Sequence, residues 1–421
     1  MTLRCLSLAI YLLAGCEYSG ADFTPDRASA SNCNVVLITI DCLRADHVGC
    51  YGYPRTVTPH LDALARSSHT MVTAYSQAGW TIPSVASILT GLYPSQHLLI
   101  TPDTRLGDRV QTMAEFLSIH GYATAAVLGH IFFKETYNIN QGFRVYDLST
   151  LELGDPHLVR TSPHLTARAL TVLGDLPEPF FLWVHYFDPH SEYLPHQKYR
   201  FGDQPKDLYD GEIAFTDAAI GGLLAGIQDR GVWDRTIIMV VSDHGEEFRE
   251  HRGINHETLY EEVVRIPVII RVPPDHHRLK QPALEPAPMR QVDILPTLAA
   301  LLDFSDVQVG PGANALAVSF NAGPLYLERE AFWNKIKRRA VMRGSDKLVI
   351  TFEKNGIRKE LFDLQADPAE TRNLVLQQPG VVEDLERILA TCQVQDPAAA
   401  IQRIELEEEL AEGLRAMGYL Q

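Results

Sequence analysis

The chain has 421 residues, of which 46% are hydrophobic and 21% charged, a composition typical of a globular enzyme. This length allows a large buried core and predicts one large and one small domain. The formal net charge of −16 and the lack of a basic stripe exclude a nucleic-acid partner from the expected functions. The densest basic run, residues 335–339, is expected at a solvated strand edge.

The N-terminus has the features of a targeting segment. Arg4 precedes an apolar run, residues 5–14, which is too short to span a bilayer but suits a signal peptide. The run ends in Leu13-Ala14-Gly15-Cys16, which resembles a bacterial lipoprotein signal. We therefore expect removal of residues 1–15, lipidation of Cys16, a tether over 16–32 and anchoring to a membrane of the bacterial envelope. An ordinary secretory signal, or a misplaced start site, is the alternative.

Short apolar runs separated by helical lengths predict an α/β fold with a doubly wound, mostly parallel sheet. The runs are almost continuously apolar, as expected for strands buried on both faces. They are residues 34–40, 122–128, 180–186, 236–242 and 266–271. Helices are expected between them, for instance over residues 112–119 and 211–227.

The sequence changes character after about residue 320. Residues 340–353 and 356–364 predict antiparallel strands, and helical segments follow up to residues 406–420. We therefore expect a catalytic α/β domain over 33–320 and a smaller C-terminal α+β subdomain over 321–421.

The stretch GWTIPSVASILTGLYPSQH, residues 79–97, places a hydroxyl at the head of a predicted helix. Apolar residues recur there at helix-face intervals, and Gly91 and Pro94 close the segment. Taken alone, Thr81 is best explained as a helix cap that accepts a backbone N–H. The alternative is a nucleophile at a helix N-terminus, which favours bound anions.

Charged and polar side chains directly follow two of the predicted strands. Asp41 follows the first strand, and Asp243 and His244 follow the fourth. In an open parallel sheet, ligands bind beyond the carboxyl ends of the strands. Two carboxylates and an imidazole at this edge predict a divalent-metal site, although either aspartate alone could cap a turn.

Eight segments, in this order and spacing, resemble the sulfatase family of the alkaline phosphatase superfamily. The resemblance covers nearly all of the chain after the tether and implies a metal-dependent esterase fold with a small antiparallel sheet near the C-terminus. The segments are residues 34–53, 58–65, 81–97, 209–224, 240–248, 256–270, 291–301 and 361–374.

By position, the resemblance implies that Asp41, Asp243 and His244 hold one divalent metal. Calcium is expected first, with magnesium, manganese or zinc as alternatives. Thr81 stands at the position of the family nucleophile, so we expect it to be both the helix cap and the nucleophile. Its activation would require direct coordination to the metal.

The resemblance also implies substrate-side residues. His190 would contact the transferred group, and His256 would be a second substrate-side histidine and proton donor. His185 is a further candidate for substrate binding. The family's active-site lysine should lie near residues 129–134, where His130 and Lys134 are the candidates.

The chain departs from the family pattern at three positions. Thr81 replaces the cysteine or serine that matures to formylglycine, Val85 replaces an arginine, and Cys42 replaces a second aspartate. A formylglycine hydrate ejects sulfate by collapsing to an aldehyde, a route closed to threonine. Thr81 would instead form a phospho- or sulfo-ester that water must hydrolyse, so phosphoryl chemistry is at least as well supported as sulfuryl chemistry.

Three functions therefore compete. The first is an envelope-anchored, one-metal hydrolase of a small-molecule, glycan or lipid ester of sulfate or phosphate. The second is a two-metal phosphodiesterase or phosphotransferase, with His256 and either Asp188 or His190 as extra ligands. The third is a lipoprotein that kept the fold and lost the reaction, which the changes at Val85 and Cys42 favour.

Overall fold

The computed structural model describes residues 33–154, 159–276, 282–304, 310–330, 336–392 and 401–416. The predicted signal peptide, tether and Cys16 lie outside these residues. One compact unit, Ser31–Gln421, includes both the large sheet and the C-terminal antiparallel sheet. Within the described residues, no helix is both long and apolar enough to cross a membrane.

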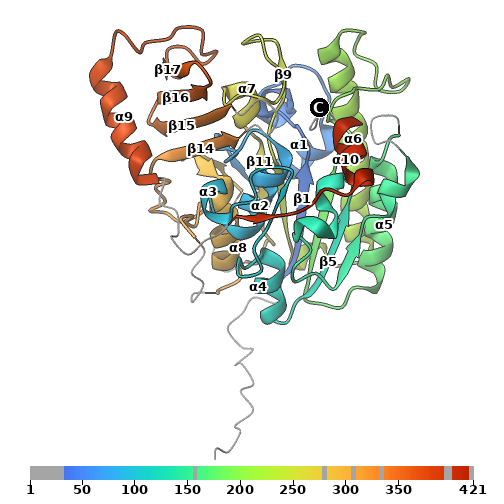
Figure 1. Cartoon of the computed structure of the whole chain (residues 1–421). Helices are drawn as coiled ribbons and strands as arrows, with labels where there is room; N and C mark the ends of the chain where they lie inside the picture. Colours follow the sequence, from blue (N-terminus) through green and yellow to red (C-terminus); the bar gives the residue numbers. More distant parts are fainter. Residues whose placement is uncertain are drawn as a thin grey trace, which may run out of the picture. The chain divides into compact units, whose positions relative to one another are not determined.

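An eight-stranded sheet forms the centre of this unit, and Figure 1 labels three of its strands, β11, β1 and β5. The strand order is β12-β2-β11-β8-β1-β7-β5-β6. The five strands from β8 to β6 run parallel, which confirms the predicted mostly parallel sheet. The strands are β1 (Asn34–Ile40), β2 (His69–Met71), β5 (Ala123–Leu128), β6 (Val145–Asp147), β7 (Phe180–Tyr186), β8 (Thr236–Ser242), β11 (Val268–Arg271) and β12 (Leu284–Glu285).

The fifth predicted parallel strand, residues 266–271, forms β11 but runs antiparallel to β8 and β2. The chain leaves β8 and forms the short pair β9 (Glu247–Phe248) and β10 (Ile254–Asn255), then the four-residue helix α7 (Glu261–Val264). None of these elements is long enough to carry the chain back across the sheet. Strand β11 therefore starts at the edge where β8 ends, and its direction is reversed.

Helices cover both faces of the sheet. Alternate residues of β1 divide between two core clusters, with Val35 and Leu37 in one and Val36 and Ile38 in the other. This explains the unbroken apolar pattern of the strand. The first cluster includes side chains of α2 (Thr81–Thr90), α4 (Met113–Ile119) and α8 (Ile294–Leu301), and the second those of α1 (Pro59–Ala65), α5 (Ser162–Asp175) and α6 (Pro205–Asp229).

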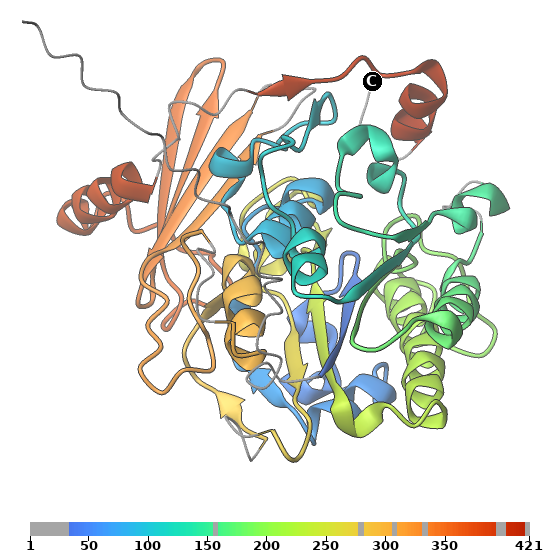
Figure 2. The ribbon, with the colours of Figure 1, turned by 90° about the horizontal axis from the view of Figure 1, so that it is seen from below.

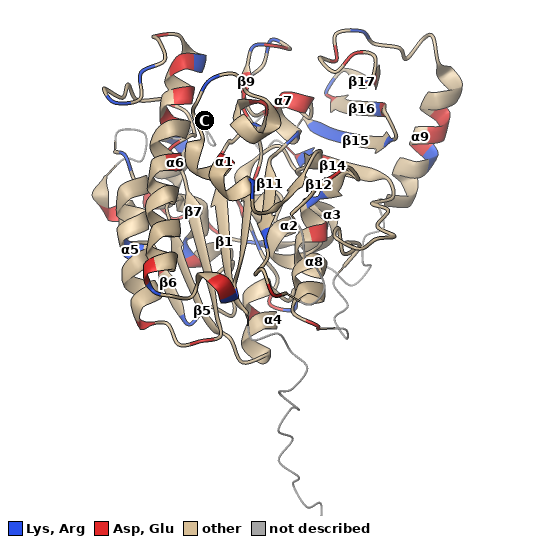
Figure 3. Cartoon of the chain, turned by 180° about the vertical axis from the view of Figure 1, so that it is seen from behind, with Lys and Arg blue, Asp and Glu red and all other residues tan. Residues whose placement is uncertain are grey.

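The predicted C-terminal sheet is confirmed as a four-stranded antiparallel meander with helix α9 packed against its middle strands. Its elements are β14 (Leu325–Glu330), β15 (Lys337–Arg343), β16 (Asp346–Glu353), β17 (Gly356–Asp363) and α9 (Pro379–Cys392). The basic run on β15, blue in Figure 3, lies on an interior strand and not at an edge, because β14 and β16 pair with it on either side. Lys337 and Arg339 form ion pairs with Glu330 of β14.

The last described segment does not join this subdomain, contrary to the prediction. Strand β18 (Gln402–Arg403) pairs with β4 (Thr104–Arg105), and helix α10 (Glu408–Ala416) packs near the short helix η3 (Ile131–Phe133). In Figure 2 the two red helices, α9 and α10, lie on opposite sides of the view. The apolar face of α10 explains this position, since Leu410 and Leu414 are buried in the same core cluster as α2 and α4.

A buried ion-pair network connects the antiparallel sheet to α7. Lys347 of β16 is fully buried, and its Nζ lies 3.0 Å from Glu261 Oε1 and 2.9 Å from Glu370 Oε1. Burial disfavours the charged ammonium, but the two carboxylates outweigh this effect and raise the pKa of Lys347 above its usual value.

We expect Lys347→Met to lower the free energy of unfolding by about 3 kcal/mol, because it leaves two carboxylates without their cation. Urea denaturation of the full chain measures this change. Arg343→Met is the matched control, since its pair with Asp384 is exposed on both sides and should contribute less than about 1 kcal/mol. Equal losses in the two variants would show that the buried network adds nothing.

Candidate active site

Four neighbouring parallel strands carry polar side chains to one edge of the sheet. Asp41 and Asp243 directly follow β1 and β8, whose last residues, Ile40 and Ser242, are paired. His185 lies in β7, in register with Thr39 of β1, and His130 follows β5 after one glycine. All four side chains are fully buried. The structure thus brings Asp41 and Asp243 together at paired strand ends, as the strand-end argument expects, and places His185 and His130 on the neighbouring strands.

Thr81 is the first residue of α2, and Trp80 occupies the N-cap position without a side-chain cap bond. The Thr81 hydroxyl lies 3.4 Å from His244 Nε2. The prediction that Thr81 caps the helix is therefore wrong. A side chain that caps a helix belongs to the N-cap residue, which here is Trp80, and accepts the N–H of the second or third helical residue. Thr81 lies one position later, and its hydroxyl faces the cluster instead. Gly91 ends the helix with a left-handed backbone, as predicted.

Asp41, Asp243 and His244 bring their potential ligand atoms within 4.8 Å of one another. His244 Nε2 lies 3.7 Å from Asp41 Oδ1 and 3.6 Å from Asp243 Oδ2. Neither of these oxygens has a hydrogen-bond partner among the residues that the structure describes. His244 Nδ1 donates to the carbonyl of Gly245 at 2.8 Å, which leaves the lone pair on Nε2. Two inward carboxylate oxygens and one imidazole lone pair fit a divalent cation.

The same burial makes these charges costly when no cation is bound. Burial raises the pKa of Asp41 to about 7, and burial together with the charge of Asp41 raises the pKa of Asp243 well above its usual value. Burial lowers the pKa of His185 to about 4 and that of His244 well below its usual value. Neutral imidazoles do not compensate two carboxylates, so a bound cation is the expected source of positive charge.

His185 and His130 lie beside Asp41. His185 Nε2 is 3.4 Å from Asp41 Oδ2, and its Nδ1 is 2.7 Å from the hydroxyl of Thr39. His130 Nε2 is 3.7 Å from the same Asp41 oxygen, and its Nδ1 accepts the backbone N–H of Phe132. The printed contacts of both histidines therefore include Asp41, and their predicted contact with substrate stays a prediction.

Lys134 is not brought into this cluster. Its Nζ lies 3.0 Å from Glu409 Oε1 of α10, and the side chain of Lys134 is about one-third exposed. Helix η3 buries Phe132 and Phe133, and the chain then turns Lys134 outward. The prediction that Lys134 binds substrate is therefore not supported by its position, whereas His130 lies at the site.

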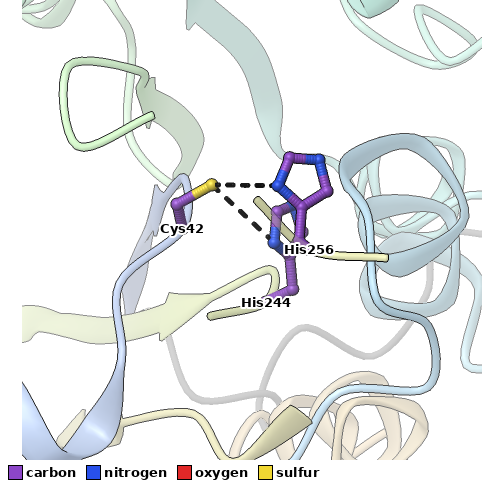
Figure 4. Close-up of side chains that lie close together, drawn as sticks. All are labelled: Cys42, His244 and His256. Atoms are coloured by element: carbon purple, nitrogen blue, oxygen red, sulfur yellow. Dashed lines mark hydrogen bonds between the residues drawn. The ribbon is translucent and has the colours of Figure 1, made fainter. Parts of the chain in front are cut away.

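Cys42 follows Asp41 in the chain, and its side chain also belongs to the buried cluster. Its Sγ lies 3.8 Å from His244 Nδ1 and 3.9 Å from His256 Nδ1 (Figure 4). Its backbone has a positive φ of 56°, which the hydrogen bonds of its N–H to Asp243 Oδ1 and of Tyr209 to its carbonyl hold in place. Burial and the charge of Asp41 raise the pKa of the thiol well above its usual value.

The sulfatase family model matches residues 33–304, about two-thirds of the chain. The chain belongs to the sulfatase family. An N-acetylgalactosamine-6-O-sulfatase of Bacteroides thetaiotaomicron is 24% identical over 502 aligned positions, covering 90% of this chain and 96% of that protein. Human arylsulfatase A is 28% identical over 357 positions, covering 70% and 68%.

The fold agrees with this assignment. The structure of a phosphonate monoester hydrolase of Agrobacterium radiobacter has a TM-score of 0.72 to this chain at 17% identity, over 90% of this chain and 98% of that one. The predicted family, fold class and ester-hydrolase activity are thus confirmed. This sulfatase-family enzyme differs from the family pattern at Val85, which is fully buried in the apolar core around α2.

Sequence reasoning assigned no role to four residues that support the sulfatase site. Gln291 donates to the backbone carbonyl of Asp243 at 2.6 Å, and Tyr209 donates to that of Cys42. Glu246 Oε1 lies 3.7 Å from His256 Nδ1, and Arg329 Nε donates to the carbonyl of His256. The first three residues lie in segments of family resemblance, which was the available signal. Arg329 lies on β14, a strand that was not predicted.

Asp188 was an alternative ligand for a second metal, and the structure gives it another role. Its carboxylate accepts the backbone N–H groups of Thr161 and Ser162 and the hydroxyl of Thr161 at the start of α5. Both oxygens are therefore engaged by a helix N-terminus, where a carboxylate is stabilised. The prediction of Asp188 as a metal ligand is not supported.

We expect Asp243→Asn to remove the bound divalent ion. The loss of affinity should exceed the roughly 10- to 100-fold typical of residues that only support a ligand. Asp243 is fully buried. The chelated variant should nevertheless be no less stable than chelated wild type, because the change removes one of two adjacent buried charges.

Elemental analysis and thermal unfolding after chelation measure both effects. Asp234→Asn is the control, since its side chain is largely exposed and lies at the start of β8. Unchanged ion content in Asp243→Asn would show that Asp243 is not a ligand.

Proposed function

We propose that the chain is a metal-dependent hydrolase that cleaves a sulfate, phosphate or phosphonate ester with Thr81 as its nucleophile. The observation that carries the proposal is the Thr81 hydroxyl 3.4 Å from His244 Nε2, within a buried group of two carboxylates and one imidazole. Membership of the sulfatase family supports ester hydrolysis. The similar structure is that of a phosphonate monoester hydrolase, which supports a phosphorus ester as substrate as much as a sulfur ester.

Asp41, Asp243 and His244 are the residues that would hold the ion, with the Thr81 hydroxyl beside it. When bound, a divalent ion supplies a lowered hydroxyl pKa and stabilises negative charge on the transferred group. Thr81 lies at the N-terminus of the ten-residue helix α2, whose backbone dipole also favours an anionic group there.

Thr81 Oγ1 would attack the sulfur or phosphorus atom and release its proton to water. The bond from that atom to the leaving oxygen breaks, the leaving oxygen takes up a proton, and Thr81 becomes an ester. Water then attacks the same atom, releases the inorganic anion and restores the hydroxyl. His190 and His256 border the cluster and are the candidates for the proton on the leaving oxygen.

The substrate class we propose is a small-molecule or glycan ester. The relative named for N-acetylgalactosamine-6-O-sulfatase activity supports a sulfated sugar. The net charge of −16, with the basic run of β15 partly neutralised by acidic residues of β14, gives no support for a nucleic-acid substrate. The competing proposal, a protein that kept the fold and lost the reaction, predicts no turnover of any ester and no covalent adduct at Thr81.

We expect Thr81→Ala to abolish turnover and Thr81→Ser to retain part of it, because serine preserves the hydroxyl. Loss of a covalent nucleophile should reduce kcat by roughly 10⁴- to 10⁶-fold. A panel of aryl sulfates, phosphate monoesters, phosphodiesters and phosphonates, tested with several metals, supplies the assay. Intact-mass analysis during turnover should show a phosphate- or sulfate-sized adduct at Thr81.

Thr90→Ala is the matched control, because Thr90 is a buried hydroxyl of the same helix that donates to the carbonyl of Ala86 and accepts the backbone N–H of Leu92. It should change stability and not the mass adduct. Full activity of Thr81→Ala would show that water attacks directly.

We also propose that Cys16 is lipidated and anchors the enzyme to the bacterial envelope, on the basis of Leu13-Ala14-Gly15-Cys16. Cys16→Ala should then leave the protein unprocessed or move it from the membrane fraction to the soluble fraction. Fractionation and mass analysis of the mature N-terminus measure this outcome. Stable attachment requires more than one acyl chain, so the mass should show several. A wild-type protein that is secreted without lipid would contradict the anchor.

A further inference from the structure

A row of polar residues, three of them arginines, crosses one end of the C-terminal antiparallel sheet, whose strands β14, β15 and β16 lie side by side in Figure 1. Arg329 of β14 is paired with Arg338 of β15, Arg338 with Thr351 of β16, and Thr351 with Arg358 of β17. Paired residues of neighbouring strands project from the same face of a sheet. Ala340, two residues beyond Arg338, belongs to the core cluster that contains α7. The row therefore faces α7 and not α9.

The inner end of the row lies at the active site. Arg329 is buried, and its Nε donates to the backbone carbonyl of His256 at 3.1 Å. Neighbouring strands lie about 4.8 Å apart, so Arg338 and Thr351 follow about 5 and 10 Å farther across the sheet. At the outer end, the side chain of Arg358 is 46% exposed. The row thus extends from the side of His256 to the protein surface.

The middle of the row contains buried polar atoms without hydrogen bonds. Arg338 is 9% exposed, and its Nη1 has no hydrogen-bond partner among the described residues. The hydroxyl of Thr351 is fully buried and also has none there. A buried donor without a partner is unfavourable, most of all when it is charged. An oxyanion next to both side chains would satisfy the guanidinium and the hydroxyl together.

The charges around Arg338 leave this place positive. In the part of the chain that the structure describes, its guanidinium forms no ion pair. Burial lowers the pKa of Arg338, and the more distant Glu257 and Glu247 offset only part of this effect. Burial also raises the pKa of Glu247 to about 7, so that carboxyl does not carry a full negative charge at neutral pH. Arg329 stands directly opposite, and like charges in that position repel each other.

We propose that Arg338 and Thr351, beside Arg329, bind a second oxyanion, and that the ester attacked by Thr81 carries this group. A guanidinium offers two parallel N–H donors to a sulfate, phosphate or carboxylate, and a neighbouring hydroxyl adds a third. The inference rests on the proposed function, because Thr81 defines where the ester lies. It narrows the substrate class to esters with at least two anionic groups, such as a sugar that bears a further sulfate or carboxylate.

Selenate tests the oxyanion site without an activity assay, because its selenium atom gives an anomalous X-ray signal. Crystals of the full-length protein are soaked in sodium selenate. We expect one anomalous peak near Thr81, at the N-terminus of α2, and a second peak beside Arg338 and Thr351. Arg338→Gln should lose the second peak and keep the first.

Binding in solution tests whether the second oxyanion belongs to the substrate. Thr81→Ala, which cannot consume the ligand by the proposed route, is titrated calorimetrically with disulfates of α,ω-alkanediols of different lengths and with the matching alkyl monosulfates. The best disulfate should bind roughly 10- to 100-fold more tightly than its monosulfate, with an optimum at one chain length. Adding Arg338→Gln or Thr351→Val should abolish this gain and leave the affinity for the monosulfate unchanged.

Arg343→Gln is the matched control, because it removes the same charge from β15 at an exposed pair with Asp384. It should keep both selenate peaks and the gain in affinity. Thermal unfolding separates binding from a structural role. Thr351→Val removes a hydroxyl without a described partner, so the ligand-free variant should melt no lower than its parent. A lower melting temperature with an unchanged preference for disulfates would overturn the role of Thr351 in binding.

Equal affinities for disulfates and monosulfates, with no selenate peak beside Arg338, would overturn the second site, and a peak near Thr81 would leave the proposed function intact. A peak beside Arg338 without any gain for disulfates would show an adventitious ion only. A gain that survives Arg338→Gln would overturn the assignment to Arg338. A peak beside Arg338 with none near Thr81 would contradict the proposed function and the placement of the ester, but not the second oxyanion site.

Discussion

The site depends on two carboxylates, Asp41 and Asp243, that neighbouring parallel strands deliver to one buried place. Among the described residues, their inward oxygens have no hydrogen bond. The imidazole of His244 faces them, but burial lowers its pKa, so it is neutral and brings no positive charge. Such an arrangement is unfavourable until a cation occupies it. Gln291 and Tyr209 hold the backbone around these carboxylates and His185 lies against Asp41, so much of the surrounding structure keeps them in place.

Most of this arrangement could be predicted from the sequence, because it follows from local rules. Asp41 and Asp243 end apolar strands, and ligands gather at the carboxyl ends of parallel strands. Features that depend on packing between distant segments could not be predicted. Lys134 turns outward because the two phenylalanines of η3, which precede it, are buried. Helix α10 packs near η3 because the apolar face of α10 joins the core there. Arg329 reaches His256 from a strand with no sequence signal.

The two lost family residues have different consequences. Val85 lies inside the apolar core, so the change removes a cationic side chain from the site and adds packing to α2. Cys42 stays in the centre of the site, between Asp41 and two imidazoles, and its strained backbone is held by two hydrogen bonds. A side chain kept in that position at the cost of strain is better explained by a retained function than by drift, which argues against a degenerate enzyme.

In the mechanism proposed above, solvent and substrate must reach a nucleophile, Thr81, that is itself completely buried. Thr81, Asp41 and Asp243 have no exposed surface, whereas His190 is 3% and His256 is 5% exposed. Access therefore lies on the side of these two histidines, and so do the loops that follow β7 and β10. Because a threonine ester can only be released by water, this side must admit a water molecule after the leaving group has gone. In this mechanism the same loops would therefore determine which leaving group fits and how fast the ester is hydrolysed, whether sulfur or phosphorus is attacked.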